Sequence, residues 1–120
     1  MDKLPVLKKN REFQRIYNKG KFAASALLVV YVLPNGLPVT RLGITASRKA
    51  GKAVKRNRMR RLIRENARIL YNRLEKGFDV VIVARKTEKI VNLDIVGREL
   101  RYLLRKLELL KDKDNRENDV

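Results

Sequence analysis

Arginine and lysine side chains crowd one stretch of this chain, and they are the residues whose spacing best suggests a chemistry. Residues 55–65 read KRNRMRRLIRE, with a single acid at the end. From Arg48 to Arg68 there are ten basic residues and one acid, so this segment carries +9 of the formal net charge of +17. The planar guanidinium group can grip a phosphate through two hydrogen bonds and can stack on a base. The stretch therefore predicts a polyanionic partner.

A solvated helix face is the ordinary alternative for such a run of charge. Solvated faces usually mix acids and bases at i,i+4 spacing, whereas here Glu65 alone can pair, with Arg61 and Arg68. Cations also gather at the N-terminal end of the predicted helix, where the helix dipole makes each one unfavourable by about 0.3 to 1 kcal/mol. A bound phosphate would reverse the sign of that contribution. We therefore expect the partner to be a nucleic acid.

A helical projection of residues 54–75 separates these charges from an apolar arc. The arc that we expect to face the core consists of Met59, Ile63, Ala67, Leu70 and Leu74. The opposite side, which we call the basic face, consists of Asn57, Arg58, Arg61, Arg64 and Arg68, with Arg56 and Arg60 at its border.

The residue types that are missing narrow the chemistry further. The chain has no cysteine, which excludes disulfides, thiolate zinc sites and cysteine nucleophiles, and no histidine, the usual general base. Only carboxylates, lysines and tyrosines remain as candidates for catalysis, and the sequence leaves any metal ligands unknown. The N-terminal residues carry no apolar signal core, so we expect a cytoplasmic protein. The longest apolar run, residues 22–33, is shorter than the roughly 20 residues of a membrane span.

Aromatic residues are few, and three of them could form a stacking surface for unpaired bases. These are Phe13 and Tyr17 on a predicted first helix and Tyr31 on a predicted strand. For Phe13, packing in the core is an equally good interpretation. For the remaining aromatic residues we predict simple packing, because no basic cluster adjoins them in the sequence: Phe22, Tyr71, Phe78 and Tyr102.

Helix and strand signals precede and follow the basic stretch. Asn10 predicts the N-cap of a first helix that stops at Gly20. The apolar run of residues 22–33 predicts a strand, and the PNG signal after it predicts a hairpin with the strand TRLGITAS. Alternation in that second strand predicts Leu42, Ile44 and Ala46 on the core face, and Gly43, Thr45 and Ser47 facing outward or into a cleft.

The second half of the chain shows one more strand and one more helix. The basic helix is expected to end near Gly77, and FDVVIVARK then predicts a buried strand. A final helix begins after Asn92 with an apolar stripe at Val96, Leu100, Leu103, Leu104, Leu107 and Leu110. Residues 111–120 lack such a stripe and predict a disordered tail, without the glycine and terminal glutamate of a calcium loop.

One long segment resembles a known family. LGITASRKAGKAVKRNRMRRLIRE, residues 42–65, resembles the signature of the protein subunit of bacterial ribonuclease P, whose hallmark is the Arg-Asn-Arg found here as Arg56, Asn57 and Arg58. LKKNREFQRIYNKG, LLVVYVLPNG and FDVVIVAR are similar to that family in order and spacing, so the resemblance covers about residues 7–85.

The resemblance implies both a fold and a function. The implied fold is a mixed α/β (α+β) single domain over residues 1–111, an α-β-β-β-α-β-α sandwich with a left-handed βαβ crossover, like a domain of a small-subunit ribosomal protein. The left hand comes from the resemblance alone, because about 98% of such connections are right-handed. The implied function is to assist a catalytic RNA, which uses Mg²⁺ to remove the 5′ leader of precursor tRNA, with one protein per RNA. The resemblance thus implies that the protein itself has no catalytic residue.

The resemblance also implies roles for particular residues. Those expected to face the catalytic RNA are Lys49, Lys52, Arg56, Asn57, Arg58, Arg61, Arg64 and Arg68. Those expected to line a cleft for the single-stranded leader are Phe13, Tyr17, Tyr31 and Thr45, with Arg56 and Arg60 at its rim.

Three other functions remain open on the sequence. A ribosomal-type structural RNA-binding protein would share the charge and the helix without an aromatic cleft. A membrane-surface module is disfavoured, since the apolar arc of the basic helix is needed for the core and the chain has no tryptophan. A nuclease that works without RNA would have to use carboxylates, lysines or tyrosines.

Overall fold

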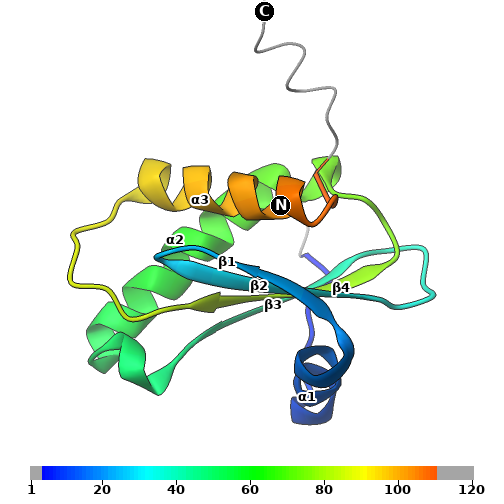
Figure 1. The fold of residues 1–120 in the computed structure, drawn as a ribbon, viewed down its shortest axis with the longest axis horizontal. Helices are drawn as coiled ribbons and strands as arrows, with labels where there is room; N and C mark the ends of the chain where they lie inside the picture. The colour runs from blue at the N-terminus through cyan, green and yellow to red at the C-terminus, as the bar shows by residue number, and fades with distance from the viewer. Residues whose placement is uncertain (1–3, 111–120) are drawn as a thin grey trace, which may run out of the picture.

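A four-stranded sheet lies between two helical layers in the computed structural model, which describes residues 4–110 (Figure 1). This architecture confirms the predicted mixed α/β single domain and its order of elements. The elements are α1 (Asn10–Lys19), β1 (Lys21–Ala24), β2 (Leu28–Pro34), β3 (Arg41–Ala46), the short 3₁₀ helix η1 (Arg48–Ala50), α2 (Ala53–Leu70), the short 3₁₀ helix η2 (Tyr71–Arg73), β4 (Phe78–Ala84) and α3 (Leu93–Lys106).

The strand order of the sheet is β1-β2-β4-β3. β2 pairs antiparallel with β1 and with β4, while β3 pairs parallel with β4. The predicted hairpin between β2 and β3 is therefore wrong, because β4 lies between these strands. Val80, Val81 and Ile82 of β4 are all buried, as befits a central strand with both faces covered. The chain just after β2 still runs beside the residues just before β4, since the Asn35 N–H donates to the Gly77 carbonyl (2.9 Å).

The parallel pair β3 and β4 is connected through α2, which is the crossover that the resemblance implies. The hand of this crossover stays a prediction.

Each face of the sheet packs against a different set of helices. In Figure 1, α2 and α3 lie on one side of the sheet, whereas α1 lies on the other side beneath one end of it. Alternating residues of β2 follow this division. Val30 and Val32 are buried in the main core with α2 and α3, while Tyr31 and Leu33 pack against the smaller cluster around Ile16 of α1. Much of the α1 side is thus left uncovered by helices.

The boundaries of the first elements differ from the prediction. Lys9, not Asn10, is the N-cap of α1, and its backbone N–H donates to the Glu12 carboxylate (3.2 Å). The end of α1 at Gly20 is confirmed, with the Gly20 N–H donating to the Ile16 carbonyl (2.8 Å). The apolar run of residues 22–33 forms two strands instead of one. Ser25 breaks it, because its hydroxyl donates to Glu99 of α3 and fixes a turn between β1 and β2.

The boundaries of the later helices are closer to the prediction. α2 ends at Leu70 and gives way to η2, so it is shorter than the expected helix to residue 75. Asn92 caps α3 as predicted, since its side-chain oxygen accepts from the Ile95 N–H (2.9 Å). Leu110 lies beyond α3 and pairs with Leu74. The predicted tail, residues 111–120, lies outside the described residues, so its disorder stays a prediction.

Within residues 4–110, the helices are too short or too polar to cross a membrane.

Candidate RNA-binding surfaces

The apolar arc predicted for α2 is buried in the structure. Met59, Ile63, Ala67 and Leu70 face the core, while the basic face points outward with Asn57, Arg58, Arg61 and Arg64 exposed and Arg56, Arg60 and Arg68 half-buried. This arrangement confirms the helical projection.

The projection missed one buried polar residue, Asn66. Its amide donates to the carbonyls of Leu62 and Leu93 (3.0 Å each), which joins α2 to the start of α3. Gly97 makes room for the amide, because a Cβ at that position would meet the Asn66 side-chain oxygen at 2.5 Å. The signal in the sequence was an asparagine within an otherwise apolar flank of the helix.

The basic face is divided between two sides of α2. On one side, Arg58 Nη2 donates to the Val91 carbonyl (2.8 Å), and Lys55 Nζ donates to the Thr87 carbonyl (2.8 Å). Both carbonyls belong to the connector between β4 and α3. The two side chains therefore brace this connector, and the remaining donors of Arg58 are available to a ligand because the residue is exposed.

On the other side of α2, Arg64 and Arg68 line a groove of about 620 Å³. The opposite wall includes Leu7 of the N-terminal segment and Phe13 of α1, and Gly43 of β3 contributes to the groove between them. Arg68 also forms an ion pair with Glu65. The groove thus combines cationic side chains, an aromatic ring and the edge of the sheet.

The three aromatic residues predicted to stack bases do lie together. The ring centroids of Phe13 and Tyr17 are 6.4 Å apart, and those of Tyr17 and Tyr31 are 4.9 Å apart, within the usual range of aromatic contacts. All three rings are half-buried. Burial raises the pKa of Tyr17, and the neighbouring Tyr31 raises it further by a smaller amount. The phenol of Tyr17 therefore stays protonated at neutral pH. Phe13 lies against Gly43, where a Cβ would come within 2.7 Å of its ring.

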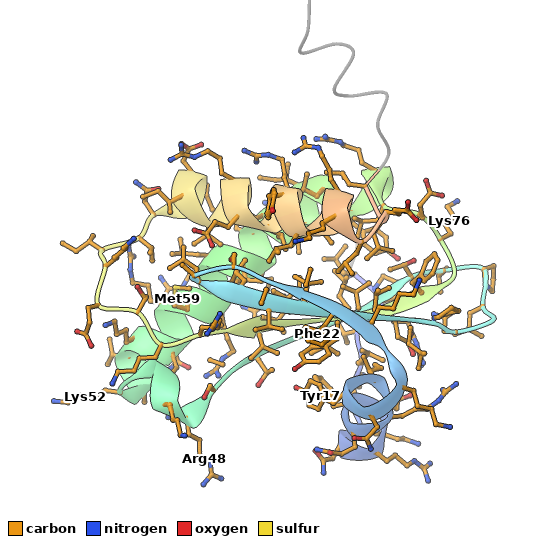
Figure 2. The ribbon with its side chains drawn as sticks, in the orientation of Figure 1. Tyr17, Phe22, Arg48, Lys52, Met59 and Lys76 are labelled. Atoms are coloured by element: carbon orange, nitrogen blue, oxygen red, sulfur yellow. The ribbon has the colours of Figure 1, made fainter. Side chains whose placement is uncertain are left out.

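A fourth ring, Phe22, extends this group, and the prediction that it packs in the core is wrong. Its centroid lies 5.7 Å from that of Tyr31, and the residue is 63% exposed. Figure 2 shows Phe22 and Tyr17 on the same side of the sheet. We call Phe13, Tyr17, Tyr31 and Phe22 together the aromatic row. Neighbours in the sequence could not reveal it, because the contact with Tyr31 arises from pairing between β1 and β2.

The other aromatic residues divide in the same way. Tyr71 and Phe78 pack against the main core, as predicted. Tyr102 does not, because it is 55% exposed on α3 with Lys106 Nζ 5.8 Å from its ring centroid.

The remaining predicted residues lie on β3, on α2 and just before α2. Thr45 is half-buried, two residues along β3 from Gly43 and on the same face. Arg60 donates to Asn57, while Arg56 Nε is buried and has no hydrogen-bond partner within the described residues.

Lys49 and Lys52 are exposed near the start of α2. In Figure 2, Arg48 and Lys52 lie at the end of the sheet opposite Tyr17. Cationic groups therefore stand across the open sheet face from the aromatic row.

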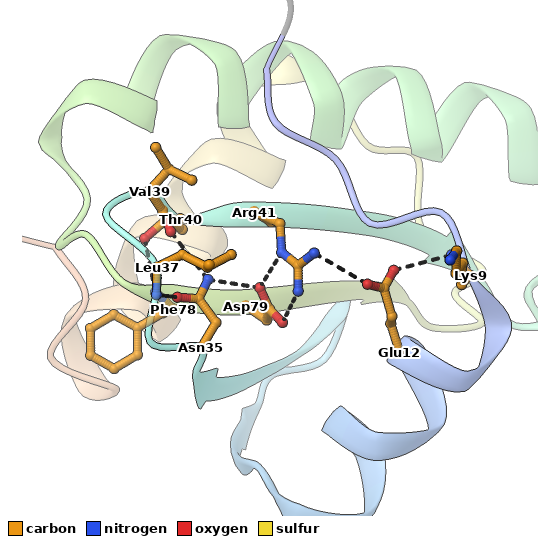
Figure 3. Close-up of polar contacts among 9 residues, drawn as sticks. All are labelled: Lys9, Glu12, Asn35, Leu37, Val39, Thr40, Arg41, Phe78 and Asp79. Carbon is orange, nitrogen blue, oxygen red and sulfur yellow. Dashed lines mark hydrogen bonds and ion pairs between the residues drawn. The ribbon is translucent and has the colours of Figure 1, made fainter.

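A network of polar contacts fixes α1 to the sheet (Figure 3). Arg41 of β3 donates to both carboxylate oxygens of the buried Asp79 (2.8 Å each) and to Glu12 of α1 (3.2 Å). Asn35 donates to Asp79 as well (2.9 Å). Burial raises the pKa of Asp79, but the hydrogen bonds from Arg41 and Asn35 outweigh it and leave this pKa below its ordinary value. Because Phe13 follows Glu12 in α1, the network helps to position the two rings of the aromatic row that α1 carries, Phe13 and Tyr17.

The described residues contain no group of three or more acidic, histidine or cysteine side chains placed to hold a metal ion. What these surfaces can do chemically is to hold phosphates with arginine and lysine and to stack unpaired bases on exposed rings.

Comparisons with known proteins identify the family. The model of a family described as Ribonuclease P matches residues 1–108. The ribonuclease P protein component of Caldanaerobacter subterraneus subsp. tengcongensis is 42% identical over 113 residues, which cover 94% of this chain and 97% of the relative. That of Clostridium kluyveri is 40% identical over 107 residues, covering 88% and 96%.

Solved structures give the same result. The RNase P protein of Staphylococcus aureus matches with a TM-score of 0.80 and 34% identity, covering 91% of this chain and 100% of that one. The RNase P protein of Thermotoga maritima matches with a TM-score of 0.72 and 34% identity, covering 83% and 96%. Because the family model matches nearly the whole chain and these relatives share both sequence and fold with it, the chain belongs to the family of ribonuclease P protein components.

Proposed function

We propose that this ribonuclease P protein component binds the catalytic RNA through the basic face of α2, and the unpaired 5′ leader of precursor tRNA along three rings of the aromatic row, Phe13, Tyr17 and Tyr31. The RNA subunit carries out the hydrolysis, and the protein alone is inactive. The observation that carries the proposal is the cluster of these three rings, because they lie on the side of the sheet that α1 covers only in part and close to an arginine-lined groove. Such a combination fits a single strand, whose bases are free to stack.

The residues divide between the two partners by their position. We assign to the catalytic RNA the exposed cations and the exposed Asn57 around the start of α2 and on its outer side: Lys49, Lys52, Asn57, Arg58 and Arg61. We assign to the leader Phe13, Tyr17, Tyr31 and Thr45, with Arg56 and Arg60 nearby. Arg64 and Arg68 were predicted to face the catalytic RNA, but they line the groove beside Phe13 and can serve the leader as well.

Mg²⁺ belongs to the complex rather than to the protein in this proposal. Phosphates crowded by folding of the catalytic RNA and docking of the substrate repel one another, and the protein's cations neutralise part of that charge. In the cytoplasm, the complex of one protein and one RNA should then be active at a lower Mg²⁺ concentration than the RNA alone. A purely structural role on ribosomal RNA is less well supported, because it would not need an open aromatic face.

The test mixes the protein with a bacterial ribonuclease P RNA and leader-bearing precursor tRNA at low Mg²⁺. We expect faster leader removal when the protein is present. Arg61→Ala should weaken binding of the catalytic RNA, whereas Tyr31→Ala should mainly reduce the preference for precursor over mature tRNA. If the protein gives no gain in leader removal, or if both variants change both measurements equally, the proposal is wrong.

A further inference from the structure

Phe22 is an exposed aromatic side chain that neither the core nor the residues assigned above account for. It lies on β1, an edge strand that pairs within the described residues only with β2. In β1, Ala23 is buried toward the main core, so the neighbouring Phe22 projects to the opposite face, the one that carries α1. At 63% exposed, the ring leaves most of its apolar area in water, which is unfavourable in the free protein.

The ring of Phe22 continues the aromatic row across the sheet. Phe13 lies over Gly43 of β3, Tyr31 projects from β2, and Phe22 lies directly across from Tyr31 in the β1–β2 pairing. The planes of Phe22 and Tyr31 are inclined by only 35°, whereas Tyr17 meets Tyr31 edge-on at 68°. The row therefore runs from β3 to the far edge of the sheet and ends in its most exposed ring.

Charge near this end of the row also suits a nucleic acid strand. Lys19, the last residue of α1, is exposed and precedes Phe22 by three residues, whereas Lys21 shares the other face of β1 with Ala23. A strand that leaves Tyr31 toward β1 therefore remains beside a cation that can attract its phosphates.

We propose that Phe22 forms an additional subsite that stacks one further unpaired nucleotide of the bound strand beyond the nucleotide at Tyr31. This inference rests on the proposed function, since it takes the strand to be the precursor leader. Every base has a π-face, so the subsite accepts all four bases and senses the length of the leader more than its sequence. The substrate class it favours is precursor tRNA with leaders long enough to reach β1.

The experiment measures binding of precursor tRNAs, whose leaders grow one nucleotide at a time, to the complex of ribonuclease P RNA and protein. With wild-type protein, affinity should rise with leader length until the aromatic row is filled. With Phe22→Ala the rise should stop at a shorter leader, and longer leaders should bind about 5- to 140-fold more weakly, the range expected for the loss of one base stack. Short leaders and mature tRNA should bind as they do to wild type.

Matched variants separate stacking from other effects of the ring. Phe22→Leu keeps an apolar side chain but no ring, so its affinity for long leaders should fall as that of Phe22→Ala does. Phe22→Trp keeps an aromatic ring and should retain the wild-type affinity. Tyr102→Ala removes a ring of similar exposure from α3, on the other side of the sheet, and should leave the length dependence unchanged.

The outcomes distinguish this inference from the proposed function. If Tyr31→Ala weakens leader binding but Phe22→Ala does not at any length, the subsite is disproved and the proposed function stands. If neither variant changes leader binding, the proposed function fails and the subsite with it. Equal weakening at all lengths, mature tRNA included, would overturn the subsite. So would sedimentation showing that the wild-type protein is a dimer and the Phe22→Ala protein a monomer, because the ring would then serve a protein contact.

Discussion

Replacing Arg41 with methionine tests the network that attaches α1 to the sheet. The variant keeps an unbranched side chain but removes both hydrogen bonds to Asp79 and the ion pair with Glu12. The Asp79 carboxylate, 2% exposed, is then left with Asn35 alone. Breaking a buried ion pair from one side costs about 3–5 kcal/mol. Because the Arg41 side chain is 25% exposed, we expect the lower end of this range, about 3 kcal/mol.

The pH dependence of this loss gives a sharper test than its size. In the wild type the pKa of Asp79 is lowered, so its contribution to stability is present above the unfolded pKa of about 4 and is lost as the pH falls through the folded pKa. In Arg41→Met the burial remains without the guanidinium, so we expect the pKa of Asp79 to rise above its ordinary value. The free energy of unfolding of the variant then falls as the pH rises from the unfolded pKa of Asp79 through its raised folded pKa. The difference between the two proteins should be largest near pH 7 and shrink toward pH 4.

Urea unfolding of the RNA-free protein, followed by circular dichroism, measures both effects. Arg98→Met is the matched control, because Arg98 pairs with Asp94 at 3.9 Å on the surface, with side chains 66% and 80% exposed. That pair should contribute less than about 1 kcal/mol. Should Arg41→Met cost no more than Arg98→Met near pH 7, or should its cost grow as the pH falls, the network would not hold Asp79 as argued.

Two further predictions concern the groove beside Phe13. Gly43→Ala would place a Cβ 2.7 Å from the Phe13 ring, so unfolding measurements should show a loss of about 1–3 kcal/mol of stability. Titration with each RNA should show weaker binding of the leader and unchanged binding of the catalytic RNA. Arg64→Ala should reduce the dependence of leader binding on salt, lowering the slope of log K against log salt by about 0.7, the value for one contact to a single strand. Lys76→Ala removes an exposed cation from outside the groove and is the control, because an equal change there would mean that Arg64 acts only through net charge.

The basic helix could be predicted from the sequence because its signal is local. A period of 3.6 residues identifies the buried side of α2 without knowledge of what packs against it, and Met59, Ile63, Ala67 and Leu70 are buried as expected. The same projection could not show that Arg58 and Arg64 serve different sides. That division depends on the connector near Val91 and on the groove at Phe13, both of which come from distant parts of the chain.

The wrong prediction of a hairpin between β2 and β3 and the wrong prediction of core packing for Phe22 have the same cause. Strand neighbours in sequence often pair, and a turn signal after β2 favours that local interpretation. β4 pairs with β2 in place of β3. Consecutive residues of β4 are apolar and can be buried on both faces, so β4 takes the central position and β3 becomes the edge strand. Phe22 was misjudged for the same reason, since its environment is set by its partner across the strands, Tyr31, and not by its neighbours along the chain.

In the proposed function one small domain holds two RNAs, and the position of α2 at the edge of the sheet would allow this. One side of the helix faces the connector to α3, and the other faces the groove that leads to the aromatic row. α1 closes that groove from the opposite side, and its attachment depends on Arg41, which bridges Glu12 and Asp79. A strand lying in the groove thus touches elements that the core and the Arg41 network already hold in place. Because the core and this network already hold these elements, we expect the protein to lose little ordering free energy on binding, so that the leader's own ordering is the main cost that stacking must offset.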